Sequence, residues 1–254
     1  MLVVRSLAAI GLLAVAPAAW AEDPAPLASQ AEAPAAPAPD SAPADPAEKK
    51  ASPEEVAAAK ATADRVIARF RVGDLFDNVT GDDGIPKGRH RLSGLVCTLT
   101  DSTPYEGIMV FPQPLARGED VGCNTEMVGM RQTVYATRYP QRPSAEQVVA
   151  DSIAAMRQSF KGLKPFKGPA ISATRGDPGF PKPVTARFVG KLNGQTMYTR
   201  TSAVVIGDWV YAQRVTGPEE QAAMIDLMAE IELIMLIEDV VNNPPTPDAA
   251  ASAS

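Results

Sequence analysis

Two cysteines and one histidine are the residues of this sequence most suited to covalent or metal chemistry. Cys97 and Cys123 are its only cysteines. A redox pair would favour Cys-x-x-Cys spacing with the first cysteine at a helix N-terminus, and this pair has neither feature. Two cysteines in an exported chain most simply form a disulfide. Because the N-terminus indicates export, as described below, we predict a structural Cys97–Cys123 bond.

His90 is the only histidine, so any Ser-His-Asp or Cys-His site must use it. It lies in a basic cluster with Arg89 and Arg91, which would lower its pKa and repel a metal cation. We expect a solvated loop or strand end, with contact to an anion as the alternative. The sequence also lacks nucleophile-elbow, zinc-protease, Walker and dinucleotide glycine patterns. We therefore predict no catalytic residue, no metal and no cofactor, and an enzyme is the less favoured class.

The elements that must position polar side chains are clearest between residues 184 and 237. Strands are predicted at 184–192, 195–206 and 209–216, joined by the two-residue turns Asn193-Gly194 and Gly207-Asp208. Asn-Gly favours a type I′ turn, because both residues tolerate a positive φ. With turns of this length, Leu192 faces Gln195 and Ile206 faces Trp209.

This register divides the three strands into two faces. We assign the first face to the core under a helix, because its residues are mostly apolar. Its members are Phe188, Leu192, Met197, Ala203, Val205, Val210 and Ala212.

The second face places Arg187 directly opposite Arg200, with Tyr198 nearby and Trp209 and Tyr211 at its other end. Opposed like charges are unfavourable unless a carboxylate or another anion lies between them. Arginine and aromatic residues are enriched at interface hot spots. Our hypothesis is that this face is partly open and that these five residues bind a partner. The alternative is that a helix covers the face and internal carboxylates neutralise the arginines.

A helix follows the third strand, and the Thr216–Glu219 spacing predicts a capping box at its start. Its methionines, Met224, Met228 and Met235, either fill the core or form an adaptable interface, and we interpret them as core. Further apolar residues extend around the helix and need a second cover, from this chain or a partner. These are Leu233, Leu236 and Ile237.

Two more helices are predicted at 53–70 and 145–160, each after a serine N-cap. The first either docks on the domain or binds something else. Further strands are predicted at 92–100, 107–111 and 130–139, and 162–183 reads as a long connection. Consecutive strands with added helices predict an α+β fold with an antiparallel sheet flanked by helices.

From residue 133 onward this pattern resembles the PsbP-like and DcrB-like exported domains. The matching stretches are 135–139, 144–160, 187–194, 199–211 and Gly217-Pro218-Glu219-Glu220. The resemblance covers about half of the chain. It implies an antiparallel sheet sandwiched by helices, in binding and assembly factors without a shared catalytic set. The chain lacks the lipid-attachment cysteine of many DcrB-like proteins.

The N-terminus predicts the compartment. Arg5, an apolar run at 7–16 and Ala19-Trp20-Ala21 predict a signal peptide cleaved near Ala21, with an uncleaved anchor as the alternative. No later stretch reads as a membrane helix, so a periplasmic or secreted location is expected. The predicted order is signal peptide 1–21, disordered Pro/Ala-rich tether 22–50, amphipathic helix 51–71, α+β domain 72–241 and disordered tail 242–254.

Charge narrows the class of partner. Residues 51–241 hold 21 of the 24 basic and 23 of the 30 acidic side chains, so their net charge is −2. A nucleic-acid partner would call for a basic face. The leading hypothesis is a non-enzymatic binding or assembly module of the cell envelope with an envelope or extracellular protein partner. The alternative is a small-molecule-binding protein or hydrolase with a site near Arg89, His90 and Arg91.

The tether is expected to contribute nothing to the fold, because residues 22–50 lack apolar periodicity. Deleting them should leave the urea unfolding midpoint unchanged. A stability loss of about 1 kcal/mol or more would show that this segment docks on the domain.

Overall fold

A computed structural model describes residues 50–112, 115–127, 129–169 and 179–244. The predicted signal peptide, the tether up to residue 49 and the tail from residue 245 lie outside the described residues. The described residues belong to one compact unit. Among the described residues, no helix combines the length and the apolarity needed to cross a bilayer.

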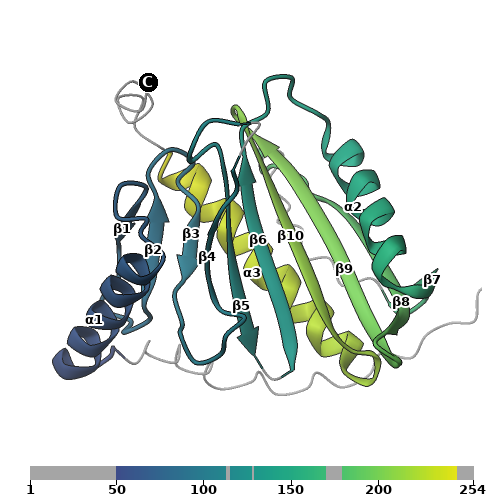
Figure 1. The fold of residues 1–254 in the computed structure, drawn as a ribbon, viewed down its shortest axis with the longest axis horizontal. Coiled ribbons are helices and arrows are strands. Elements are labelled where there is room, and N and C mark those ends of the chain that lie inside the picture. Colours follow the sequence, from purple (N-terminus) through teal and green to yellow (C-terminus); the bar gives the residue numbers. More distant parts are fainter. Residues whose placement is uncertain (1–49, 113–114, 128, 170–178, 245–254) are drawn as a thin grey trace, which may run out of the picture. The chain divides into compact units, whose positions relative to one another are not determined.

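The fold is α+β, as predicted, with two antiparallel sheets and flanking helices (Figure 1). The larger sheet has the strand order β4-β5-β6-β10-β9-β8-β7. Its strands are β4 (Gly107–Val110), β5 (Asp120–Met127), β6 (Met130–Thr137), β7 (Lys161–Pro165), β8 (Val184–Leu192), β9 (Gln195–Ile206) and β10 (Trp209–Pro218). The smaller sheet contains β1 (Phe76–Asn78), β2 (Lys87–His90) and β3 (Val96–Thr98). The helices are α1 (Pro53–Arg69), α2 (Ala145–Ser159) and α3 (Ala222–Asn242), the last preceded by the 3₁₀ turn η1 (Glu219–Gln221).

The predicted pairing of β8, β9 and β10 is confirmed. Leu192 pairs with Gln195, and Ile206 pairs with Trp209. Asn193 and Gly194 have φ values of 51° and 85°, the two positive values that a type I′ turn requires. Arg187 and Arg200 are therefore direct partners across two strands.

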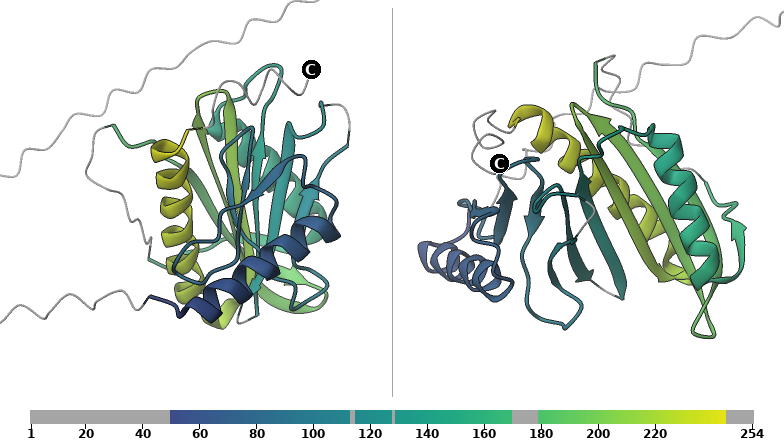
Figure 2. Two further views of the ribbon diagram at one scale, coloured as in Figure 1. Left: turned by 90° about the vertical axis from the view of Figure 1, so that its left-hand side faces the viewer. Right: turned by 45° about the horizontal axis from the view of Figure 1, so that its top comes forward.

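Helices α2 and α3 lie on opposite sides of the larger sheet (Figure 2). Helix α2 packs Met156 and the following Phe160 against Phe188, so the face predicted to be core under a helix is covered there. Helix α3 packs on the other face, where Leu233 and Ile237 join Tyr211 in the main core.

Helix α1 docks on the domain, which resolves the alternative left open by its sequence. Ala63, Val66 and Ile67 belong to the same core as Phe76 and Leu95. The predicted serine N-cap is present and is part of a capping box: the Ser52 hydroxyl accepts from Glu55 N, and the Glu55 carboxylate accepts from Ser52 N.

Several elements differ from the expectation. Strands β1 and β2 lie between the predicted helix 53–70 and the predicted strand 92–100, where no element is predicted, and β7 overlaps the predicted 162–183 connection. Strand β2 reads Lys-Gly-Arg-His, which has no apolar alternation to reveal it. The predicted cap of α3 is absent, because β10 continues to Pro218 and η1 begins without a side-chain cap bond.

The predicted disulfide is present. Cys97 on β3 is bonded to Cys123 on β5, and both side chains are buried. The bond therefore joins the smaller sheet to the larger one, across a sequence separation of 26 residues.

Breaking this bond should destabilise the domain without abolishing its strands. Cys97→Ala is expected to lower the free energy of unfolding by about 2–4 kcal/mol, because the unfolded chain regains loop entropy. Urea unfolding of the variant and of wild type with and without reductant measures the loss. Equal stability of all three samples, or two free thiols in the exported wild type, would contradict the expectation.

Candidate functional site

The residues predicted to form an open partner face lie instead beneath α3. Arg200 has no exposed surface, and Tyr198, Trp209 and Tyr211 are also buried. The prediction of an open face here is wrong, because α3 covers it together with the smaller sheet, where His90 contacts Trp209 and Ser93 O accepts from the Tyr211 hydroxyl. Only Arg187 of the five reaches the surface, with 19% of its side chain exposed.

A buried ion cluster replaces the expected surface, as the alternative interpretation supposed. Arg200 donates to Asp226 Oδ1 over 3.0 Å and to Glu230 Oε2 over 2.7 Å. Arg187 donates to Asp226 Oδ2 over 3.0 Å, and the Tyr198 hydroxyl donates to Oδ1 over 2.5 Å. Two carboxylates of α3 thus neutralise the two opposed arginines. Burial and the Asp226 carboxylate together raise the pKa of Tyr198, which keeps the phenol protonated as a donor.

His90 is also buried, which corrects the expectation of a solvated position. Its Nδ1 lies 2.8 Å from Ser93 Oγ, and its ring packs against Phe76 and the edge of Trp209. Arg91 points elsewhere and pairs with Asp77. The alternative site around Arg89, His90 and Arg91 therefore has no accessible imidazole.

The methionines of α3 are placed opposite to the prediction. Leu233, Leu236 and Ile237 are buried, whereas Met224 and Met235 are 44% and 56% exposed. The interpretation as core is wrong for Met224 and Met235, whereas Met228 is half-buried. The helix is apolar on nearly every side, so the spacing of its apolar residues does not identify the buried side. An apolar stripe remains on the outer side of α3, formed by Met224, Leu227, Ile231 and Met235.

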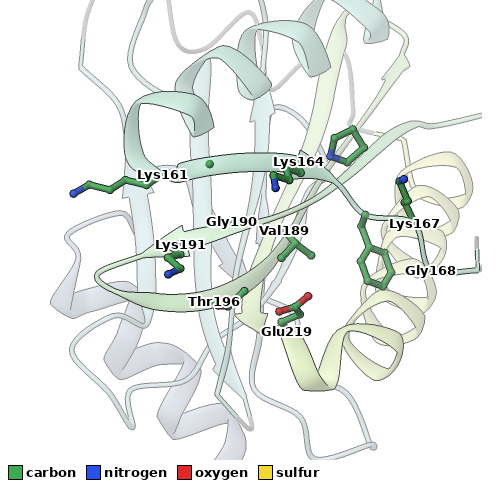
Figure 3. A pocket seen from close by; sticks show the side chains of 12 residues that line it. Lys161, Lys164, Lys167, Gly168, Val189, Gly190, Lys191, Thr196 and Glu219 are labelled. Carbon is green, nitrogen blue, oxygen red and sulfur yellow. The ribbon is translucent and has the colours of Figure 1, made fainter.

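A pocket at the β7–β8 edge was not found from the sequence (Figure 3). We call it the lysine pocket. Its volume is about 890 Å³, and β7, β8, the start of β9 and η1 surround it. Its main side chains are Lys161, Lys164, Phe166, Lys167, Val189, Lys191, Thr196 and Glu219.

Strand pairing brings the lysines together. Lys161 pairs directly with Lys191, and Lys164 pairs with Val189 beyond a register irregularity in β7. Val189 pairs in turn with Tyr198, so this pocket lies on the same face of the sheet as the ion cluster. Within the described part of the chain, none of the four lysines forms an ion pair, and Glu219 is the only acidic residue of the lining. The pocket is therefore positively charged.

Phe166 connects the lysine pocket to the ion cluster. Its ring lines the pocket and meets Tyr198 edge-on, with ring centroids 5.0 Å apart. The Arg187 guanidinium lies over the same ring, 5.8 Å from its centroid, and Phe166 N donates to Arg187 O. The buried charges thus hold one apolar wall of the pocket in place. Of the five predicted binding residues, Arg187 and Tyr198 lie behind this wall and support it. The feature of the sequence that could have indicated the pocket is the lysine-rich run at 161–167.

His90 predicts a specific pH dependence. Desolvation lowers its pKa from 6.5 to about 4, so the folded state disfavours the imidazolium. Its contribution to stability is complete above pH 6.5 and falls as the pH drops toward 4. Linkage gives a loss of about 2 kcal/mol between pH 7 and pH 5.

Urea unfolding of wild type and His90→Gln at both pH values isolates this contribution. We expect the stability advantage of wild type over the variant to shrink by about 2 kcal/mol at pH 5. The same pH dependence in both proteins would show that His90 does not titrate in this way.

Comparisons with known proteins place the chain in no family. No family model matches it. No curated protein matches it either. The resemblance to PsbP-like and DcrB-like domains is therefore not confirmed.

Three solved structures share a low similarity with the chain. PA94 from Pseudomonas aeruginosa, a protein of unknown function, is 12% identical over 59% of this chain and 95% of its own, with a TM-score of 0.34. LpqN of Mycobacterium tuberculosis, involved in cell envelope biogenesis, is 13% identical over 52% of this chain and 83% of its own, with a TM-score of 0.29. CalU16 from Micromonospora echinospora is 12% identical over 58% and 89%, with a TM-score of 0.20. These TM-scores are too low to support an inference about function.

Proposed function

We propose that this protein is a non-enzymatic binding module of the cell envelope whose lysine pocket holds an anionic ligand with an apolar part. The observation that carries this proposal is the direct pairing of Lys161 with Lys191 in a pocket that Lys164 and Lys167 also line. Like charges that face each other across two strands are destabilising, and an anion between them removes the repulsion.

The pocket combines two kinds of surface. Phe166, Val189 and Pro165 are apolar and suit a hydrocarbon or ring, whereas lysine ammonium groups suit a carboxylate or phosphate. Figure 3 shows Lys161, Lys164 and Lys191 along β7 and β8, Lys167 at the opposite end of the pocket from Lys161, and Glu219 on the η1 side. A charged head would therefore lie toward β7 and β8. The volume is in the range of roughly 300–1,000 Å³ that is usual for small-molecule sites.

The disulfide bond is consistent with an exported location. Disulfides form and persist in oxidising compartments, and Cys97–Cys123 is such a bond. The predicted signal peptide would deliver the chain to the periplasm or the outside of the cell.

A second candidate function is assembly with an envelope or extracellular protein. The apolar stripe of α3 favours it, because contiguous exposed apolar side chains mark interaction surfaces. The five residues first predicted for this role lie on the covered side of the sheet, so the outer side of α3 is the surface we now propose for it.

The pocket proposal is tested by isothermal titration calorimetry on the chain without residues 1–21. Decyl phosphate and decanoate, each below its micelle concentration, supply the two anionic heads on one apolar chain. Decanol lacks the charge, and inorganic phosphate lacks the chain. We expect both anionic amphiphiles to bind at least about tenfold more tightly than decanol or phosphate alone.

Charge-matched variants locate the site. Lys161→Ala/Lys191→Ala should weaken binding of both amphiphiles by about tenfold or more, because it removes the paired ammonium groups. Lys50→Ala/Lys60→Ala removes the same charge from exposed positions outside the pocket and should leave the affinity unchanged. Equal losses in the two variants, or decanol binding as tight as decanoate, would overturn the proposal.

A further inference from the structure

The sheet face that carries α2 is only partly covered by that helix. Helix α2 packs on β8 and β9, while Figure 1 shows β5, β6 and β10 uncovered beside it. A groove of about 320 Å³ lies at this boundary, and we call it the tyrosine groove. Its chemistry comes from Phe111, Asp120, Tyr135, Tyr139, Asp151 and Arg214.

Aromatic rings form one wall of this groove. Phe111 and Tyr135 have ring centroids 6.1 Å apart and planes inclined by 33°. Gly122 pairs with Tyr135 across β5 and β6, and a Cβ at Gly122 would meet the tyrosine ring at 3.1 Å. Because Gly122 has no side chain, the Tyr135 ring can lie over it on this face of the sheet.

Tyr139 extends the groove beyond a single small ligand. Tyr139 is 38% exposed and also lines an adjoining hollow of about 500 Å³ with Pro140, Arg142 and Asp208. One tyrosine thus borders two hollows in succession, which is the arrangement that a ligand of several linked units requires.

The polar groups of the groove are nearly balanced in charge. Asp120 accepts from the Thr137 hydroxyl over 2.8 Å, and Asp151 accepts from Gln147 Nε2 over 2.9 Å, which orients both carboxylates. Arg214 forms no ion pair with any described residue and adds donors on the same wall. Carboxylates that keep free lone pairs accept from hydroxyl groups, and a guanidinium donates to them.

We propose that the tyrosine groove binds a neutral oligosaccharide. The C–H faces of sugar rings pack on aromatic rings, and their hydroxyl groups both donate and accept, which matches two carboxylates and one guanidinium. A polyanionic glycan would be repelled by Asp120 and Asp151. An extended peptide would seek the unpaired backbone of an edge strand, whereas β6 and β10 are each paired on both sides. This site is separate from the lysine pocket, which lies on the other face of the sheet.

Calorimetric titration of the chain without residues 1–21 tests the proposal. The probes are cellotetraose and the tetramer of N-acetylglucosamine, with glucose as the single unit and tetragalacturonate as the anionic tetramer. We expect at least one neutral tetramer to bind about tenfold more tightly than glucose and than tetragalacturonate. Absence of binding by both neutral tetramers at roughly 10 mM, or tighter binding of tetragalacturonate, would overturn the proposal.

Matched tyrosine variants assign the binding to the groove. Tyr139→Ala should weaken tetramer binding by about tenfold, and Tyr105→Ala, outside the groove lining, should not. Lys161→Ala/Lys191→Ala should leave sugar binding intact, which separates this site from the lysine pocket. Emission of the buried Trp209 monitors folding of each variant. Equal losses in Tyr139→Ala and Tyr105→Ala would show that the sugar binds elsewhere.

Discussion

The ion pairs of Arg200 constrain the position of α3 on the sheet. Arg200 is fully buried, and an unpaired buried charge costs several kcal/mol, so Asp226 and Glu230 must both reach it. These two residues are four apart and lie on one side of the helix. Because both carboxylates must reach Arg200, the side of α3 that carries them faces the sheet. Met224 and Met235 therefore lie on the outside.

The same constraint reaches the lysine pocket through a short series of contacts. Asp226 binds Arg187 and Tyr198, and both of these side chains contact the ring of Phe166. The ring is held from behind by charged and phenolic groups that are themselves fixed to α3. A site at the edge of the sheet, where strands are usually least ordered, thus has one rigid wall.

The sequence predicts those parts of the fold that local chemistry determines. Asn193-Gly194 specifies its turn, and from that turn alone the pairing of Arg187 with Arg200 follows. The local pattern does not predict which side of α3 is buried, because apolar residues lie on nearly every side of this helix. The pairing of Asp226 and Glu230 with Arg200 selects the buried side. Strand β7 and the pocket were missed because β7 is a short edge strand that reads Lys-Gly-Leu-Lys-Pro and has no apolar alternation.

Two pairs of like charges face each other on neighbouring strands of this sheet, and their repulsion is relieved in different ways. Arg187 and Arg200 face each other, and carboxylates of α3 neutralise them from within the protein. Lys161 and Lys191 also face each other, yet Glu219 is the only carboxylate of their pocket and pairs with neither lysine in the described residues. The protein supplies its own anions, from α3, where the charged pair is buried, and it leaves the pair uncompensated where it meets solvent. An external anion is the natural partner for the second pair, because it completes there what Asp226 and Glu230 complete for the first.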